Sequence, residues 1–258
     1  MTRGLLVAAG VIALLLAAGL IRYGLLRDTS TPVSVEEAVE EAGEEAGGGG
    51  RVNGVPVPAL GVYAYDTRGG ERFDAFISAE HPYPPITSIS VREGGCGVLV
   101  RWIVLEERET EWDLCPRRGG WGLGGFLDIH EFFGRRDERR YLCRNGVAFL
   151  PRGRWRYRCE FEDTRDRFRG EFVGRETLRV GGRPVATIHV RDRDLLSGQE
   201  QGTGSSETWY RAGDGLIVRR IAETRDRAPV PGGSGTYSER YELILRSLRP
   251  AGGSQVSW

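Results

Sequence analysis

Lysine is absent from the whole chain: the 36 basic residues are all arginine, and 36 acidic residues balance them to a net charge of zero. This absence excludes a Schiff-base lysine, a phosphate-loop lysine and a Ser-Lys dyad. A chain without net charge has no long-range field that attracts nucleic acid, so no nucleic-acid partner is expected. The three histidines, His81, His130 and His189, show no H-x-H or H-E-x-x-H spacing. The sequence therefore predicts no metal site.

Long apolar runs are also scarce, and the one at the N-terminus predicts a membrane segment. Gly4 to Ile21 is uncharged and mainly apolar, and as a helix it spans about 27 Å, close to the roughly 30 Å hydrocarbon core of a bilayer. Residues 1–27 are therefore predicted to be a single-pass transmembrane anchor in the cell membrane, with the rest of the chain outside the cytoplasm. The alternative is a signal peptide with Leu5 to Leu16 as its apolar region.

Cysteine does not occur before Cys96, which excludes a lipid-modified N-terminal cysteine. The four cysteines, an even set beyond a targeting segment, predict two disulfides in an oxidising compartment. The alternative is zinc, but zinc sites favour close pairs such as C-x-x-C, and these cysteines are far apart. Three pairings exist. Cys143 and Cys159 flank a predicted turn at Leu150 to Gly153, which favours a bridge across that hairpin and leaves Cys96 to pair with Cys115.

Helical patterns are nearly absent beyond the N-terminus. Residues 28–55 are rich in Glu and Gly and are predicted to form a solvated linker, with a transient helix over Val35 to Ala46. Residues 56–250 are predicted to form a single β domain. Residues 251–258 are predicted to be a disordered tail.

Strand patterns fill the β domain, and the segment from Glu171 to Arg225 shows them best. Three runs there alternate apolar and polar residues and are separated by turn residues, among them Gly181-Gly182, which is typical of antiparallel strands. Further strands are expected at 61–66, 71–77, 86–92, 97–107, 111–114, 154–161 and 236–248, with a turn at 67–70. This many antiparallel strands imply a closed or half-closed barrel or a curved sheet. The fold class is predicted to be all-β, a single antiparallel curved sheet or half-closed barrel. Pro116 to Arg140 is interpreted as an irregular region.

Some residues in the second half of the chain resemble a family. They are Val180-Gly181-Gly182-Arg183-Pro184-Val185, Glu207-Thr208-Trp209-Tyr210 and Gly215-Leu216-Ile217-Val218-Arg219. This stretch resembles uncharacterised bacterial envelope β-proteins, whose curved sheets are similar to the lipoprotein-carrier half-barrel. The resemblance implies an envelope location and a concave sheet that holds an apolar ligand, and it implies no catalytic residue. The cysteines and the predicted anchor depart from the carrier pattern.

Several short motifs lack the context that their chemistry needs. Gly120 to Gly125 matches G-x-G-x-x-G, but no helical pattern follows it, so a flexible loop and no cofactor are predicted. Asp192-Arg193-Asp194 begins like a calcium loop without the later ligands. Arg165 to Arg169 alternates basic residues with others and is interpreted as part of a wet sheet face.

Aromatic and arginine residues gather in the segment 117–140, which predicts a contact site for an apolar or lipid-like ligand or for a membrane surface. The candidate contact residues are Trp121, Phe126, Phe132, Phe133, Arg135 and Arg136. This arrangement suits a lid over a lipid-sized cavity. The alternative is that the aromatic rings close one end of a barrel.

The sequence therefore favours a non-enzymatic, membrane-anchored extracytoplasmic domain that binds an apolar ligand or an envelope protein on its concave sheet. One alternative is a hydrolase with a site around His130, formed with Asp128 and Glu131. The other is a purely structural interaction domain. A lined apolar cavity would favour the first, and a cleft that gathers His130 with carboxylates would favour the hydrolase.

Overall fold

The structure is a computed structural model that describes residues 28–42, 50–52, 54–230 and 233–251. The predicted anchor at residues 1–27 and most of the predicted tail lie outside the described residues. Within the part of the chain that the structure describes, no helix is long and apolar enough to cross a membrane.

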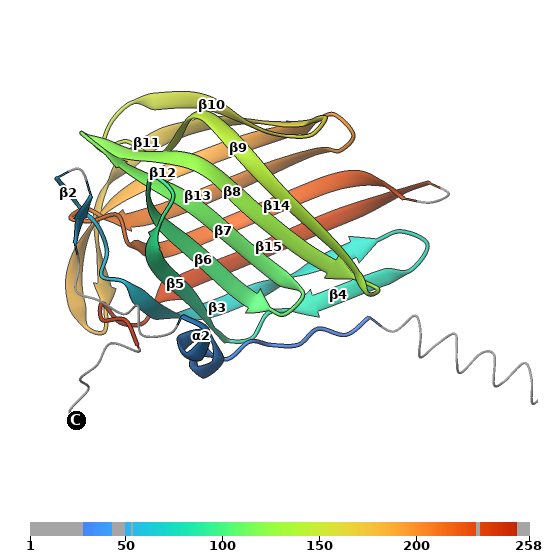
Figure 1. The fold of residues 1–258 in the computed structure, drawn as a ribbon, viewed down its shortest axis with the longest axis horizontal. Helices are drawn as coiled ribbons and strands as arrows, with labels where there is room; N and C mark the ends of the chain where they lie inside the picture. Colours follow the sequence, from blue (N-terminus) through green and yellow to red (C-terminus); the bar gives the residue numbers. More distant parts are fainter. Residues whose placement is uncertain (1–27, 43–49, 53, 231–232, 252–258) are drawn as a thin grey trace, which may run out of the picture.

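The described residues form one short helix and a succession of antiparallel strands (Figure 1). The elements are α2 Val35–Ala42, β1 Arg51–Val52, β2 Val55–Pro56, β3 Gly61–Asp74, β4 Ser78–Pro82, β5 Ile86–Gly94, β6 Gly97–Leu105, β7 Arg108–Arg117, β8 Gly120–Phe132, β9 Arg135–Phe149, β10 Arg154–Phe161, β11 Thr164–Val180, β12 Arg183–Ser197, β13 Gln201–Arg211, β14 Ile217–Val230 and β15 Gly233–Leu245. The all-β prediction is confirmed.

The sheet closes on itself, so the expected curved sheet or half-closed barrel is corrected to a closed barrel of 12 antiparallel strands among the described residues. From β5 to β15 each strand pairs with the next, and β15 then pairs with β3 from Leu245↔Tyr65 to Thr236↔Asp74. On its other edge the first half of β3 pairs with β5, and the second half pairs with the short strand β4. Closure leaves no long sheet edge unpaired.

Strand β3 runs straight through the turn predicted at Thr67 to Gly70. Gly69 has φ +127°, and a Cβ built on it would lie 2.0 Å from the carbonyl oxygen of Arg240 on β15. The glycines therefore permit the close approach of β15 to the middle of β3, and they do not reverse the chain.

The segment from Pro116 to Arg140, expected to be irregular, is a regular hairpin made by β8 and β9. Its glycines sit at close contacts between strands: a Cβ on Gly125 would lie 2.4 Å from the carbonyl oxygen of Tyr141. Register shifts between Trp121 and Gly122 and between Leu123 and Gly125 mark bulges, which bend the strand without ending its pairing. The G-x-G-x-x-G match therefore lies in an antiparallel strand.

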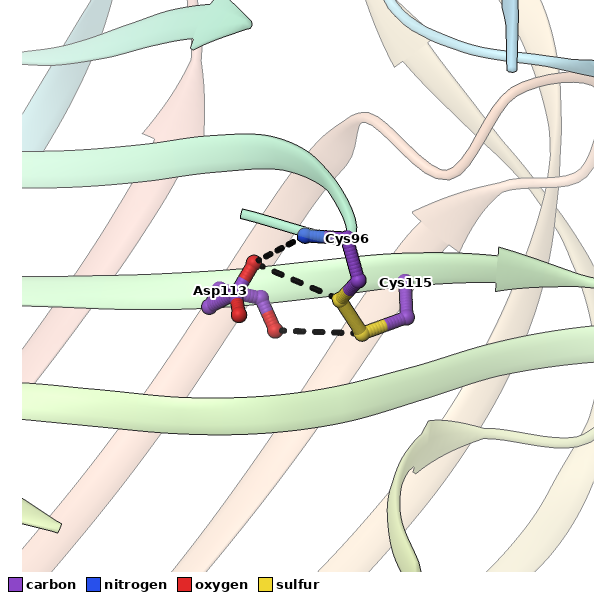
Figure 2. A group of neighbouring side chains, drawn as sticks. All are labelled: Cys96, Asp113 and Cys115. Carbon is purple, nitrogen blue, oxygen red and sulfur yellow. Dashed lines mark hydrogen bonds between the residues drawn. A yellow bond between two sulfur atoms is a disulfide. The ribbon is translucent and has the colours of Figure 1, made fainter. Parts of the chain in front are cut away.

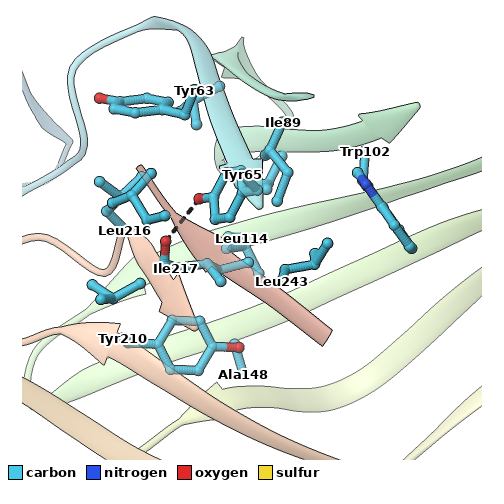
Figure 3. Packing of buried hydrophobic residues seen from close by; sticks show 14 of the residues in the cluster. Tyr63, Tyr65, Ile89, Trp102, Leu114, Ala148, Tyr210, Leu216, Ile217 and Leu243 are labelled. Atoms are coloured by element: carbon cyan, nitrogen blue, oxygen red, sulfur yellow. Dashed lines mark hydrogen bonds between the residues drawn. The ribbon is translucent and has the colours of Figure 1, made fainter. Parts of the chain in front are cut away.

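The apolar core fills one end of the barrel. Figure 3 shows how its side chains pack against one another. Tyr63, Tyr65, Ile89, Trp102 and Leu243 are fully buried there. The hydroxyl of Tyr65 donates to the carbonyl oxygen of Ile217 at 2.7 Å, so its polar atom is satisfied in the core. Residues before β3 also cover this closed end, and Val57 packs into the same cluster.

Residues 28–42 pack along the outside of the barrel, which differs from the solvated spacer expected there. Ser34 caps helix α2 by a reciprocal pair of hydrogen bonds with Glu37. Ala38 is buried against the barrel, and Glu41 forms a salt bridge with Arg101 on β6. The expected helix over 35–46 is described as far as Ala42.

Candidate functional site

The barrel contains a cavity of about 810 Å³ between its apolar core and its other end. The turns β8–β9, β10–β11 and β12–β13 and the end of β14 form the mouth, which Phe133, Glu162, Gln199 and Val230 line. These turns lie at the right of Figure 1. A barrel of this strand number leaves interior space beyond what side chains fill, and the volume suits a small-molecule ligand.

Two stacked aromatic pairs line one side of the cavity. The rings of Phe126 and Tyr141 have centroids 4.5 Å apart, and those of Tyr157 and Phe168 are 4.6 Å apart. Leu196 lies in the same apolar group. Large flat rings in a cavity wall provide much contact area for the apolar part of a ligand.

A network of paired charges forms the wall made by β3, β7, β8 and β15. Arg108 is only 3% exposed, and its guanidinium donates to Glu239 Oε1 at 2.9 Å and to Asp128 Oδ1 at 2.7 Å. Tyr83 also donates to Glu239. A buried guanidinium with partners on several strands ties this side of the barrel together.

His130 belongs to this network and is held as a cation. Its Nδ1 lies 3.0 Å from Glu71 Oε2, and its Nε2 lies 3.1 Å from Asp128 Oδ2. Burial and the charge of Arg108 act to lower the pKa of His130, but the carboxylates of Asp128 and Glu71 outweigh them and raise it to about 9. The hydrogen bonds from His130 and His81 likewise outweigh burial and lower the pKa of Glu71 to about 2.

The cavity gathers His130 with carboxylates, as the hydrolase alternative requires, but the state of His130 does not suit a general base. A general base needs a nitrogen that can accept a proton near pH 7, and both nitrogens of His130 already donate to carboxylates. The expected partner Glu131 lies apart from the group, next to Arg136 at 4.0 Å. The structure thus gathers Asp128 and His130 as predicted, but with Glu71 in place of Glu131.

The opposite wall carries four aspartates: Asp166 on β11, Asp192 and Asp194 on β12, and Asp226 on β14. Burial raises the pKa of Asp192 to about 7 against the opposing charge of Arg220. Burial and the nearby carboxylate of Asp194 also raise the pKa of Asp226 to about 7. The same causes raise the pKa of Asp166. Such perturbed groups in a cavity are candidates for a functional site.

The predicted contact residues divide between the two ends of the barrel. Phe126, Phe132, Phe133, Arg135 and Arg136 line the cavity or its mouth. Phe132 stacks on His81 with ring centroids 4.6 Å apart. Trp121 is instead 5% exposed in the core at the closed end, so it lies away from the mouth.

Both disulfides are present, in the pairing that the sequence favoured: Cys96 with Cys115, and Cys143 with Cys159. Cys143 and Cys159 lie directly opposite on β9 and β10. Figure 2 shows Asp113 beside the first bridge, where its Oδ1 accepts the amide N–H of Cys96 at 3.2 Å. The sulfurs are bonded to each other, so neither offers a thiolate to zinc. Two such bridges are typical of an extracytoplasmic domain.

No known protein family matches the chain, and no curated protein matches it. Two solved structures are similar to it. One is the hypothetical lipoprotein YmcC from Escherichia coli (K12), with a TM-score of 0.32 and 11% identity, covering 72% of this chain and 88% of that one. The other is a candidate lipoprotein from Parabacteroides distasonis ATCC 8503, with a TM-score of 0.29 and 13% identity, covering 74% and 96%.

The structural resemblance to uncharacterised bacterial lipoproteins agrees with the envelope resemblance expected from the sequence. TM-scores this low carry no argument about a ligand or a partner. Those questions depend on the cavity itself.

Proposed function

We propose that this protein is a non-enzymatic, extracytoplasmic binding protein that takes an amphipathic small molecule into the barrel through the open end. The cavity of about 810 Å³ with stacked aromatic rings in its wall supports the proposal most directly. The sequence suggested an apolar ligand. We propose an amphipathic one instead, because charged side chains share the cavity with the rings. The two disulfides support the compartment.

The predicted anchor at residues 1–27 fits this function. Asp28 Oδ2 lies 3.1 Å from His81 Nε2, which fixes residue 28 beside strand β4. In Figure 1 residues 28–34, which precede α2, extend toward the end of the barrel that carries the mouth. A membrane helix joined there would hold the mouth near the bilayer surface, from which an amphipathic ligand can enter.

The test is to fill the cavity and measure what the protein carries. The full chain is purified from the membranes of the producing bacterium, and its bound small molecules are extracted and quantified by mass spectrometry. Thr224 lines the cavity, so the Thr224→Trp variant places an indole in the ligand's space. Arg225→Trp, next on the same strand and exposed, is the matched control.

We expect one amphipathic compound in wild type and in Arg225→Trp, and several-fold less of it in folded Thr224→Trp. Lipids that merely surround the anchor should be equal in all three. If no compound falls in Thr224→Trp relative to its control, the cavity does not hold the ligand and the proposed function is wrong.

A further inference from the structure

The four cavity aspartates, which we call the aspartate wall (Asp166, Asp192, Asp194 and Asp226), have no cationic partner among the described residues. None of them forms a salt bridge there, although the chain has many others. Asp166 is only 6% exposed and lines the cavity, yet its Oδ1 has no hydrogen-bond partner. The Oδ1 of Asp192 has no hydrogen bond of standard geometry either, although the indole N–H of Trp155 lies close enough to act against the rise that burial causes in the pKa of Asp192. Buried carboxylate oxygens are normally paired, so these atoms can accept hydrogen bonds from a ligand in the cavity.

The neighbouring strands keep room for these carboxylates. A Cβ on Gly170 would lie 2.0 Å from Trp155 Nε1 and 2.3 Å from Asp192 Oδ1, and a Cβ on Gly204 would lie 2.3 Å from Asp194 Oδ1. A Cβ on Gly202 would lie 1.8 Å from Asp226 Oδ1. Any other residue at these three positions would displace a carboxylate. The wall is therefore built around the aspartates, at the cost of the packing that side chains would give.

Most of the bases inside the cavity already have partners, and Arg135 and Arg136 lie at its mouth. Arg108 and His130 pair with carboxylates of the opposite wall, and Arg139 pairs with Asp137 and Glu200. Arg220 lies nearest to the aspartate wall, but it donates to the Tyr241 hydroxyl at 2.9 Å and to Thr208 Oγ1 at 2.7 Å. These hydroxyls are neutral, so the Arg220 charge still opposes those of Asp192 and Asp194. One arginine offsets only part of the charge of four aspartates, so the ionised wall carries an excess of negative charge.

The arrangement fits an organic cation better than a metal ion. Metal ligands must converge on one point, and no three carboxylates of the wall bring oxygen atoms within 4.8 Å of one another. Among the described residues, the one group of three potential ligands that does come this close is Cys96, Asp113 and Cys115. An ammonium or guanidinium group donates several hydrogen bonds in different directions and suits oxygens that are spread out. The stacked rings of Tyr157 and Phe168 lie in the same cavity and suit the ligand's apolar body and its charge.

We infer that the ligand of the cavity is an organic cation with an apolar body, whose charged group binds the aspartate wall and whose body lies against the aromatic pairs. This inference rests on the proposed binding function and specifies the ligand's chemical class. Ionised aspartates are required, and their state depends on the charged and titratable groups that face them. For Asp192 and Asp226 these are Arg220, Asp194, Glu200, Asp128 and His130.

The test uses three probes with one body and different head groups: 4-phenylbutylammonium, 4-phenylbutanol and 4-phenylbutanoate. Each is titrated calorimetrically at pH 8 into the full chain in nanodiscs of a zwitterionic lipid, with empty nanodiscs as the blank. At pH 8 Asp192 and Asp226 are ionised, because the pKa of each is about 7. A charge-assisted hydrogen bond makes the ammonium probe bind about tenfold or more tightly than the alcohol. The carboxylate should bind most weakly.

The variant Asp192→Asn/Asp226→Asn should reduce the ammonium preference to within about threefold of the alcohol. Glu223→Gln, an exposed carboxylate on the same strand as Asp226, is the matched control and should keep the preference. Equal binding of ammonium and alcohol by wild type, or tighter binding of the carboxylate through the rim arginines, overturns the cation inference and leaves the proposed function standing. If none of the probes binds, the inference also falls, and the co-purification experiment separately decides the proposed function.

Discussion

The same substitution on opposite walls of the cavity should change stability in opposite directions. In Asp192→Asn the lost carboxylate has no cationic partner, and in Asp128→Asn it is paired with Arg108 at 2.7 Å and with His130 at 3.1 Å. Replacing a buried carboxylate by its isosteric amide usually destabilises a protein. We expect the reverse for Asp192 at pH 8.

The magnitude for Asp192 follows from its pKa, which burial raises from 3.8 to about 7. Between these values the unfolded chain is ionised while the folded carboxyl keeps its proton, so the free energy of unfolding falls as the pH rises through that interval. Three pKa units correspond to about 4 kcal/mol as an upper bound, at about 1.4 kcal/mol each. Water in the open cavity screens the charge and reduces the cost to about 1–2 kcal/mol. Asp192→Asn should therefore be about 1–2 kcal/mol more stable than wild type at pH 8 and equal to it at pH 4.

The paired carboxylate behaves oppositely. Burial acts to raise the pKa of Asp128, but Arg108 and His130 outweigh it and hold the pKa below its ordinary value. Its stabilisation is present above the ordinary pKa and is lost only as the pH falls through the lowered value. Asp128→Asn leaves Arg108 and His130 short of a partner, and should cost about 3–5 kcal/mol at pH 8.

The assay is urea unfolding of the ligand-free full chain in detergent, followed by tryptophan fluorescence at pH 4, 6 and 8. If Asp192→Asn is destabilising at pH 8, or if its effect does not change between pH 4 and pH 8, the aspartate wall is not an uncompensated cluster and the reasoning fails.

Three further outcomes can be checked by the same unfolding assay. Gly69→Ala should destabilise the closed barrel by more than about 2 kcal/mol, because its φ of +127° and the Arg240 carbonyl oxygen 2.0 Å from the added Cβ both oppose a side chain; an unchanged midpoint would show that the close approach is absent. Reducing the bridge between Cys143 and Cys159, which are 16 residues apart, should lower the free energy of unfolding by about 3 kcal/mol. Reactive thiols at Cys143 and Cys159 in the absence of reductant would refute the pairing. Arg108→Met should cost about 3–5 kcal/mol by leaving Glu239 buried without its partner; a loss below about 1 kcal/mol would mean that water replaces the guanidinium.

The fold was largely predictable from local patterns. Alternation with period 2 and turn residues such as Gly181-Gly182 identified most strands, and the turn before Arg154 placed Cys143 opposite Cys159. Local patterns could not decide between a closed barrel and an open sheet, because β15 meets β3 through residues far apart in the chain, such as Tyr237 and Phe73, and no local pattern encodes that pairing. Glycines misled the prediction twice, in β3 and β8, because close contact between strands requires the same residue as a turn.

The site was harder to predict. The alternation in Arg165 to Arg169 was interpreted as a wet sheet face, and its arginines at 165, 167 and 169 are indeed exposed. Asp166 and Phe168, between them, face the cavity. The signal for this wall was an alternation in which basic residues occupy every second position and acidic or aromatic residues lie between them. This alternation shows that one face of the strand carries an acidic side chain, but that face becomes the wall of a cavity only when the barrel closes.

The most direct measurement is a crystal structure of the protein with 4-phenylbutylammonium bound at pH 8. We expect the ammonium nitrogen within hydrogen-bond distance, about 2.7–3.2 Å, of carboxylate oxygens of Asp192, Asp194 or Asp226, with the phenyl ring against Tyr157 and Phe168. Density for the probe only outside the barrel, or a probe in the cavity with its ammonium group away from the aspartate wall, would contradict this expectation.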